Sequence, residues 1–173
     1  MSKLVFRAVA LGAMVLLIGA GAYAVAGADS GNFRASLNGY EENPDISTVA
    51  HGSFVARLSN DGDSIHYELS YSGLEGTVSA AHVHFGKPAV NGGVSFFLCN
   101  GPTTPACPQA GTVEGDIEAA DVIGPTGQGI EAGNLAEIVA AMKAGHAYAN
   151  VHSSKWPGGE IRGQIGPGLG SGD

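Results

Sequence analysis

Residues 53–73 read SFVARLSNDGDSIHYELSYSG, two runs of alternating apolar and polar side chains around a short polar segment. The apolar members are Phe54, Ala56 and Leu58 in the first run and Ile65, Tyr67, Leu69 and Tyr71 in the second. A period of two places alternate side chains on one face, as in a strand that buries one side. The NDGD segment (60–63) favours a tight turn because Asp-Gly readily takes positive φ. The stretch therefore predicts an antiparallel hairpin.

Further stretches of the same character set the fold class. They are short, and segments rich in Gly, Pro and Asn separate them. The candidates are NFRASLNG (32–39), TVSAAHVHFG (77–86), GVSFFLC (93–99), TVEGDI (112–117), HAYANVHS (146–153) and GEIRGQIG (159–166). Many short strands between such turns predict an all-β antiparallel sandwich or barrel. The length of 173 residues suits one domain of this kind.

One segment has helical spacing instead. In NLAEIVAAMKAG (134–145) the apolar residues recur at intervals of three and four: Leu135, Ile138, Val139 and Met142. Asn134 is suited to cap the helix N-terminus, with Glu137 three residues later, and Gly145 follows the last turn. We expect one short amphipathic helix that packs its apolar stripe against the sheet.

The N-terminal segment differs in character from the rest of the chain. Lys3 and Arg7 precede or flank an apolar run, and small residues follow it. This order is typical of a secretory signal peptide, with cleavage after one of the Ala-x-Ala triplets that end at Ala26 and Ala28. The alternative is an uncleaved anchor, because residues 8–28 are long enough to span a bilayer. We therefore expect a secreted, extracellular or periplasmic protein, or one that this segment tethers to the membrane.

Charge excludes two classes of partner. The chain carries 8 basic and 16 acidic residues, and cleavage after Ala28 would lower its net charge from −8 to −10, since it removes Lys3 and Arg7 and no acid. A chain this acidic argues against nucleic acid and anionic lipid as partners. The partner that we expect is an extracellular protein or an envelope component. We expect contact with a membrane only if the N-terminal segment is an uncleaved anchor.

Two cysteines lie close together in CNGPTTPAC (99–107). A loop rich in Pro and Gly can bring Cys99 and Cys107 together, and disulfides persist in exported proteins. We predict a local disulfide, and two free thiols that join a metal site are the alternative.

Three blocks together resemble the CHRD family, first described in chordin: FRASLNGYEENP (33–44), AAHVHFGKPAVNGG (80–93) and GHAYANVHSSKWPGGEIRGQI (145–165). The resemblance implies a Greek-key β-sandwich with an immunoglobulin-like or superoxide-dismutase-like look, in a secreted microbial single-domain member. It does not imply a reaction. The expected division of the chain is a signal peptide or anchor (1–28), a CHRD domain (29–166) and a flexible Gly-rich tail (167–173).

The histidines of two of these blocks are the candidate site. His82 and His84 share one face of their predicted strand, while Val83 and Phe85 face the core. Two imidazoles at this spacing can chelate one ion, as His-x-His pairs do in zinc and copper sites. His152, on the outer face of the 146–153 strand, is the third candidate ligand, and one copper or zinc ion is the cofactor such a cluster would hold.

The surroundings of the last strand allow a second interpretation. Glu160 offers a further ligand, or a partner that orients a histidine ring. Gly158 and Gly159 turn the chain, and we expect Glu160 and Arg162 to share one exposed strand face, where they form a pair with each other or with a neighbour. In the alternative without metal, the three histidines hydrogen-bond to loop backbone and to Glu160 or Arg162, and form a polar corner of the sandwich.

Two classes of function remain open. The first is a secreted or surface-associated binding or structural module, with metal bound through the histidine cluster. The second is a metal-dependent redox enzyme, because His82-Val83-His84 resembles the copper-binding block of copper/zinc superoxide dismutases. The sequence lacks their histidine-rich zinc loop, and it also lacks a Gly-x-Ser-x-Gly elbow and a phosphate-binding loop. We therefore predict no catalytic residue and favour the module.

Overall fold

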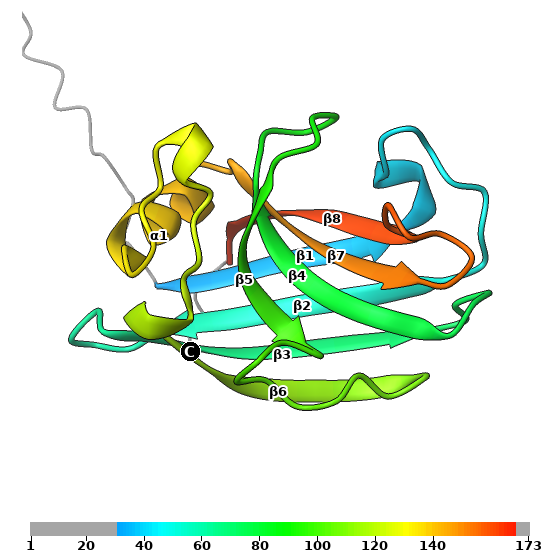
Figure 1. Ribbon diagram of the computed structural model, residues 1–173, viewed down its shortest axis with the longest axis horizontal. Coiled ribbons are helices and arrows are strands. Elements are labelled where there is room, and N and C mark those ends of the chain that lie inside the picture. The colour runs from blue at the N-terminus through cyan, green and yellow to red at the C-terminus, as the bar shows by residue number, and fades with distance from the viewer. Residues whose placement is uncertain (1–30, 169–173) are drawn as a thin grey trace, which may run out of the picture.

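The computed structural model describes residues 31–168, and eight strands dominate it (Figure 1). The strands are β1 (Asn32–Asn38), β2 (His51–Leu58), β3 (Ser64–Ser72), β4 (Val78–Phe85), β5 (Gly93–Cys99), β6 (Gly111–Glu118), β7 (Ala147–Ser153) and β8 (Ile161–Pro167). The other elements are helix α1 (Leu135–Lys143) and the short 3-10 turns η1 (Gly39–Glu41), η2 (Ala119–Asp121) and η3 (Thr126–Gln128). The predicted all-β class and the 53–73 hairpin are confirmed: β2 pairs with β3 in antiparallel register across the 60–63 turn.

The strands form one antiparallel sheet in the order β5-β4-β7-β8-β1-β2-β3-β6. The sheet folds over on itself, so that β4, β5, β7 and β8 lie against β1, β2, β3 and β6 (Figure 1). β5 and β6, the two ends of the order, come close to each other. The chain crosses from β3 to β4 and returns from β5 to β6 beside β3, which is a Greek-key connection.

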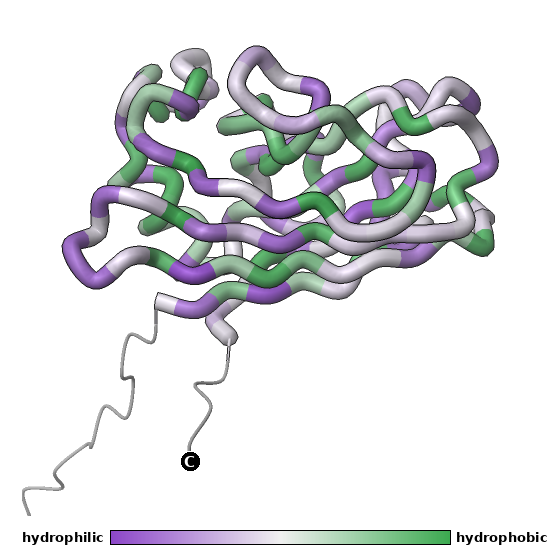
Figure 2. The backbone as a smooth tube through the Cα atoms, turned by 90° about the horizontal axis from the view of Figure 1, so that it is seen from below, coloured by the Kyte–Doolittle hydropathy of each residue, from purple (hydrophilic) through white to green (hydrophobic). Residues whose placement is uncertain are grey.

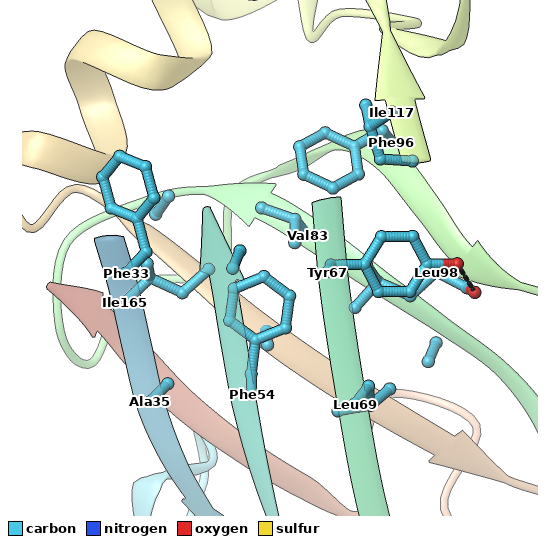
Figure 3. Close-up of a cluster of buried hydrophobic side chains, with 14 of the residues drawn as sticks. Phe33, Ala35, Phe54, Tyr67, Leu69, Val83, Phe96, Leu98, Ile117 and Ile165 are labelled. Carbon is cyan, nitrogen blue, oxygen red and sulfur yellow. Dashed lines mark hydrogen bonds between the residues drawn. The ribbon is translucent and has the colours of Figure 1, made fainter. Parts of the chain in front are cut away.

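The core lies between the two halves of the folded sheet. Alternate residues of β2 and β3 point inward and meet residues of β4 and β5, among them Phe54, Tyr67, Leu69, Val83, Phe96 and Leu98 (Figure 3). The Tyr67 hydroxyl donates to the Leu98 carbonyl at 2.6 Å and links the halves. Burying each large apolar side chain contributes about 1.5–3 kcal/mol, so the period of two accounts for the folding of the sheet onto itself.

Helix α1 packs at one end of the folded sheet (Figure 1). The Asn134 side chain accepts from the Glu137 amide, and Gly145 follows the helix with a φ of +70°. The predicted apolar stripe is buried, including Ile138 and Met142. The predictions of this helix and its caps are confirmed.

Three further predictions concern the disulfide, the C-terminal tail and the N-terminal segment. Cys99 and Cys107 are joined in a disulfide with their Cα atoms 5.1 Å apart, which confirms the pairing and leaves no free cysteine among residues 31–168. β8 continues to Pro167, and the Gly168 amide donates to the Asn32 carbonyl at 2.7 Å, so the first two residues of the expected tail complete the sheet. The signal peptide or anchor and positions 169–173 lie outside the described residues.

Hydrophilic and hydrophobic residues follow one another in turn along the strands, as the coloured backbone shows (Figure 2). Within residues 31–168 no helix is both long and apolar enough to cross a membrane.

Candidate metal centre

The three candidate histidines meet on the outer face of β4 and β7. These strands are antiparallel neighbours, with His84 opposite Tyr148, His82 opposite Asn150 and Ala80 opposite His152. One nitrogen from each of His82, His84 and His152 lies within 4.8 Å of the others. The structure thus brings together three side chains from segments about seventy residues apart. Strand alternation alone had placed each of them on the outer face of its strand.

Two irregularities in the pairing of β4 with β5 each come directly before one of the two histidines. The register shifts once between Ala81 and His82 and again between Val83 and His84. Such bulges re-aim the side chains beside them and are common next to functional sites. They leave Val83 fully buried in the core, while His82 and His84 remain on the opposite face.

Backbone carbonyls fix two of the rings. The Nδ1 atom of His84 lies 2.9 Å from the Gly92 carbonyl, and that of His152 lies 3.0 Å from the Pro157 carbonyl. A carbonyl oxygen only accepts, so each Nδ1 carries the hydrogen and each Nε2 presents a lone pair. Carbonyl partners of this kind orient metal-binding histidines in proteins.

The two lone pairs point into the space that the rings share. His152 Nε2 lies 3.1 Å from His82 Nδ1. His84 Nε2 is buried and has no hydrogen-bond partner among residues 31–168. Two nitrogens about 2.0–2.1 Å from one tetrahedral ion are roughly 3.3 Å apart, so the 3.1 Å spacing fits two ligands of one metal as well as an imidazole–imidazole hydrogen bond.

Aromatic rings form the walls of the cluster. Phe97 meets the His82 ring edge-on, with centroids 4.5 Å apart. Tyr148 stacks on His84 with centroids 4.8 Å apart and planes 2° from parallel. The carbon at the centre of the Arg162 guanidinium lies 3.4 Å from the Tyr148 ring centroid. β7 lies between β4 and β8, so Tyr148 separates His84 from Arg162.

Burial keeps the imidazoles neutral. His84 and His152 are 8% and 9% exposed, and His82 is half-buried. Desolvation is the main cause that lowers the pKa of His82 to about 3 and that of His84 to about 4, and the neighbouring histidines lower both further. Desolvation also lowers the pKa of His152. All three are therefore in the neutral form that binds a metal ion at neutral pH.

Glu160 lies apart from this network. Its carboxyl group is fully buried and accepts from the Thr48 hydroxyl at 2.9 Å, the Glu75 amide at 2.8 Å and the Ser153 hydroxyl. It makes no hydrogen bond to a histidine among the described residues, so its suggested role at the metal stays a prediction. The carboxyl group instead ties two loops to the end of β7.

The expectation that Glu160 and Arg162 form an exposed pair is wrong. Glu160 is 0% and Arg162 is 2% exposed. The Arg162 guanidinium donates to the Lys87 carbonyl at 3.1 Å and packs on Tyr148, because the 87–92 loop covers this part of the strand. Of the contacts that the polar-corner alternative expects, the described residues show the backbone contacts of His84 and His152, but none of His82 and no hydrogen bond from a histidine to Glu160 or Arg162.

The turn before β8 uses its two glycines differently. Gly159 has a φ of +129°, and a Cβ there would lie 2.6 Å from Asn150 Nδ2 and from Glu42 Oε1. Gly158 faces open space. Close packing therefore requires glycine at 159, where the turn covers the buried Glu42–Asn150 contact.

Strand alternation places Tyr148 and Asn150 on the face of β7 that carries His152, and both lie beside the cluster as expected. Three further residues beside the cluster were not predicted from the sequence: Glu42, Gly92 and Phe97. Glu42 and Gly92 come from loops, and Phe97 comes from the bulged strand β5. The histidines outside the cluster, His51, His66 and His146, are exposed, and His66 pairs with Asp116 at 2.9 Å.

Comparisons with known proteins give one finding. No match was found among curated proteins or among solved structures. The family model of the CHRD domain matches residues 33–165, a span that includes at least part of each of the eight strands and contains the three histidines. Because this match covers most of the sequence, the chain belongs to the CHRD domain family.

Proposed function

We propose that this CHRD domain is a secreted or surface-associated binding module that holds one transition-metal ion, copper or zinc, through His82, His84 and His152. The observation that carries the proposal is the His84 Nε2 atom, which is buried, carries a lone pair and has no hydrogen-bond partner in the described part of the chain. An unpaired buried acceptor costs about 1–3 kcal/mol, and a metal ion bound there would offset that cost.

A metal titration tests the proposal. The purified protein is titrated with Zn(II) and Cu(II) in competition with a chromophoric chelator, beside the variants His152→Ala and His66→Ala. We expect one ion per chain, at least about tenfold weaker binding in His152→Ala, and no change in His66→Ala. His66 is the matched control because it is an exposed histidine paired with Asp116, away from the cluster. Equal binding by wild type and His152→Ala would refute the three-histidine site.

The polar corner without metal is the direct competitor. In that case the 3.1 Å contact is a hydrogen bond from His82 Nδ1 to His152 Nε2. Wild-type protein that binds neither ion would establish this interpretation. Histidine ¹⁵N NMR separates the two, because a bound metal shifts the nitrogens that ligate it.

The redox enzyme is the second candidate function. The observation that favours it is the partial exposure of His82 to solvent. His82 is only half-buried, so the three-nitrogen cluster leaves a position accessible from solvent. Copper-loaded protein that accelerates superoxide decay, with loss of the effect in His152→Ala, would support it. If the copper-loaded protein does not accelerate superoxide decay, the binding module remains the proposed function.

The proposal of a secreted module includes export of the domain. The expected signal peptide would deliver the domain to an extracellular or periplasmic setting, where an extracellular protein or an envelope component is the partner. Intact mass of the exported protein tests this step: we expect a chain that starts after Ala26 or Ala28. A mass that includes Met1 indicates the membrane-anchored alternative.

A further inference from the structure

We propose, resting on the metal centre above, that the ion is copper held as Cu(I), selected over Zn(II) by an all-neutral donor set that lies in the field of the buried Arg162 cation. The selection is electrostatic. It depends on a three-layer stack of His84, Tyr148 and Arg162 that crosses three neighbouring strands.

The donor set is the first step. In the described residues the group that can hold a metal contains His82, His84 and His152 and no carboxylate or thiolate. Structural Zn(II) sites have four protein ligands, and catalytic ones add a water whose proton the ion weakens. Three nitrogens complete the coordination of Cu(I), whereas Zn(II) held by three histidines adds a water as its fourth ligand. The number of donors thus fits both ions, and the lack of an anionic donor favours the monovalent one.

Burial is the second step. Phe97 and Tyr148 form apolar walls beside two of the rings, and the rings of His84 and His152 are almost fully buried. Net charge is costly in such surroundings, and the cost rises steeply with the size of the charge. Three neutral ligands leave a charge of +1 with Cu(I) and +2 with Zn(II). Burial therefore penalises Zn(II) more.

The Arg162 cation is the third step. The guanidinium is a cation and is 2% exposed, so solvent screens its charge little. Its field reaches the cluster, since its central carbon lies 3.4 Å from the centroid of the Tyr148 ring and that centroid lies 4.8 Å from the centroid of the His84 ring. A fixed positive charge repels a divalent ion more than a monovalent one. Tyr148 holds it at a constant separation from the His84 ring.

Glu42 is the counter-charge that must be considered. Its carboxyl interacts with Arg162 and accepts from the Asn150 amide, yet burial raises the pKa of Glu42 to about 7. At neutral pH it thus carries only part of a negative charge and offsets only part of the guanidinium. A net positive field remains at the histidines.

Parallel titrations test the inference. Cu(I) affinity is measured without oxygen against a Cu(I)-specific chelator, and Zn(II) affinity against a zinc dye, for wild type, Arg162→Met and Arg162→Lys. We expect wild type to bind Cu(I) more tightly than Zn(II). The Cu(I)-to-Zn(II) affinity ratio should fall about tenfold in Arg162→Met. The guanidinium repels Zn(II) more than Cu(I), because Zn(II) carries one more unit of charge, and the tenfold change corresponds to this difference at an effective dielectric constant of about 20. Arg162→Lys is the matched control because it retains the charge and should retain the ratio.

Each outcome decides a different statement. Wild type that prefers Zn(II), or an unchanged ratio in a folded Arg162→Met, overturns the Cu(I) inference and leaves the metal centre intact. Protein that binds neither ion overturns both proposals. If Arg162→Met does not fold, the wild-type ratio alone still decides the inference.

Discussion

Replacement of Glu160 separates a structural carboxyl group from a metal ligand. The side chain is fully buried, and three donors from different parts of the chain converge on it: the Thr48 hydroxyl, the Glu75 amide and the Ser153 hydroxyl. Glu160→Ala removes the acceptor of all three. Glu160→Gln keeps the shape and one carbonyl oxygen, which can still accept from Thr48 and Glu75.

The cost of Glu160→Ala follows from those donors. The Ser153 hydroxyl is fully buried, so its unpaired donor costs about 1–3 kcal/mol. The donors of Thr48 and Glu75 are partly buried and reach water more easily, so we assign about 1 kcal/mol to each. The expected loss in free energy of unfolding is about 3–5 kcal/mol. In Glu160→Gln the Ser153 hydroxyl must turn to accept from the new amide, and the expected loss is about 1 kcal/mol.

Urea unfolding measures both losses, and a metal titration of Glu160→Gln measures the other role. We expect the Gln variant to bind metal like wild type, because the carboxyl group makes its hydrogen bonds away from the histidines. A loss below about 1 kcal/mol in Glu160→Ala would refute the assigned hydrogen-bond network. Metal affinity that falls tenfold or more in a folded Glu160→Gln would show instead that Glu160 is a ligand or orients one.

Three further results are expected in urea or thermal unfolding. Burial raises the pKa of Glu42 from its ordinary 4.5 to about 7, so the Glu42 contribution to stability is fully present below pH 4.5 and is lost as the pH rises to about 7. Relative to Glu42→Gln, wild type should lose up to about 1.4 kcal/mol per pH unit in that window, and parallel pH profiles would contradict the shift. Tyr67→Phe should cost about 1–3 kcal/mol because it leaves the buried Leu98 carbonyl unpaired, and an unchanged midpoint would contradict this. Reduction of the Cys99–Cys107 disulfide should lower stability by about 2–3 kcal/mol, whereas identical melting with and without reductant would disprove the cross-link.

The elements that local sequence dictates were predictable. Phe54, Tyr67 and Leu69 alternate with polar residues, and all three are buried in the core as expected. The helix has its own cap in Asn134 and its own stop in Gly145. Each of these signals lies within a few residues of the structure it produces. Propensity and periodicity therefore suffice to predict them.

The candidate site was predictable only in part, because its faces come from strand alternation but its contacts come from distant segments. Alternation places His82 with His84, and His152 with Tyr148, before any pairing is known. That β4 and β7 are neighbours depends on the Greek-key crossing. The orientation of the His82 and His84 side chains depends on two bulges, which no residue of β4 predicts.

The outer face of β7 explains the error about Arg162. Alternation in an antiparallel sheet usually means that the polar side faces water. Here every residue of β7 is buried, on both faces. The outer face has loops over it, and its polar groups pair with one another: Asn150 donates to Glu42, and Arg162 packs on Tyr148. A buried polar face must satisfy its own hydrogen bonds. Within residues 31–168, His84 Nε2 and Gln164 Oε1 are exceptions on this face. The unpaired nitrogen of His84 lies beside two other histidines, which makes the metal centre the most informative site to test.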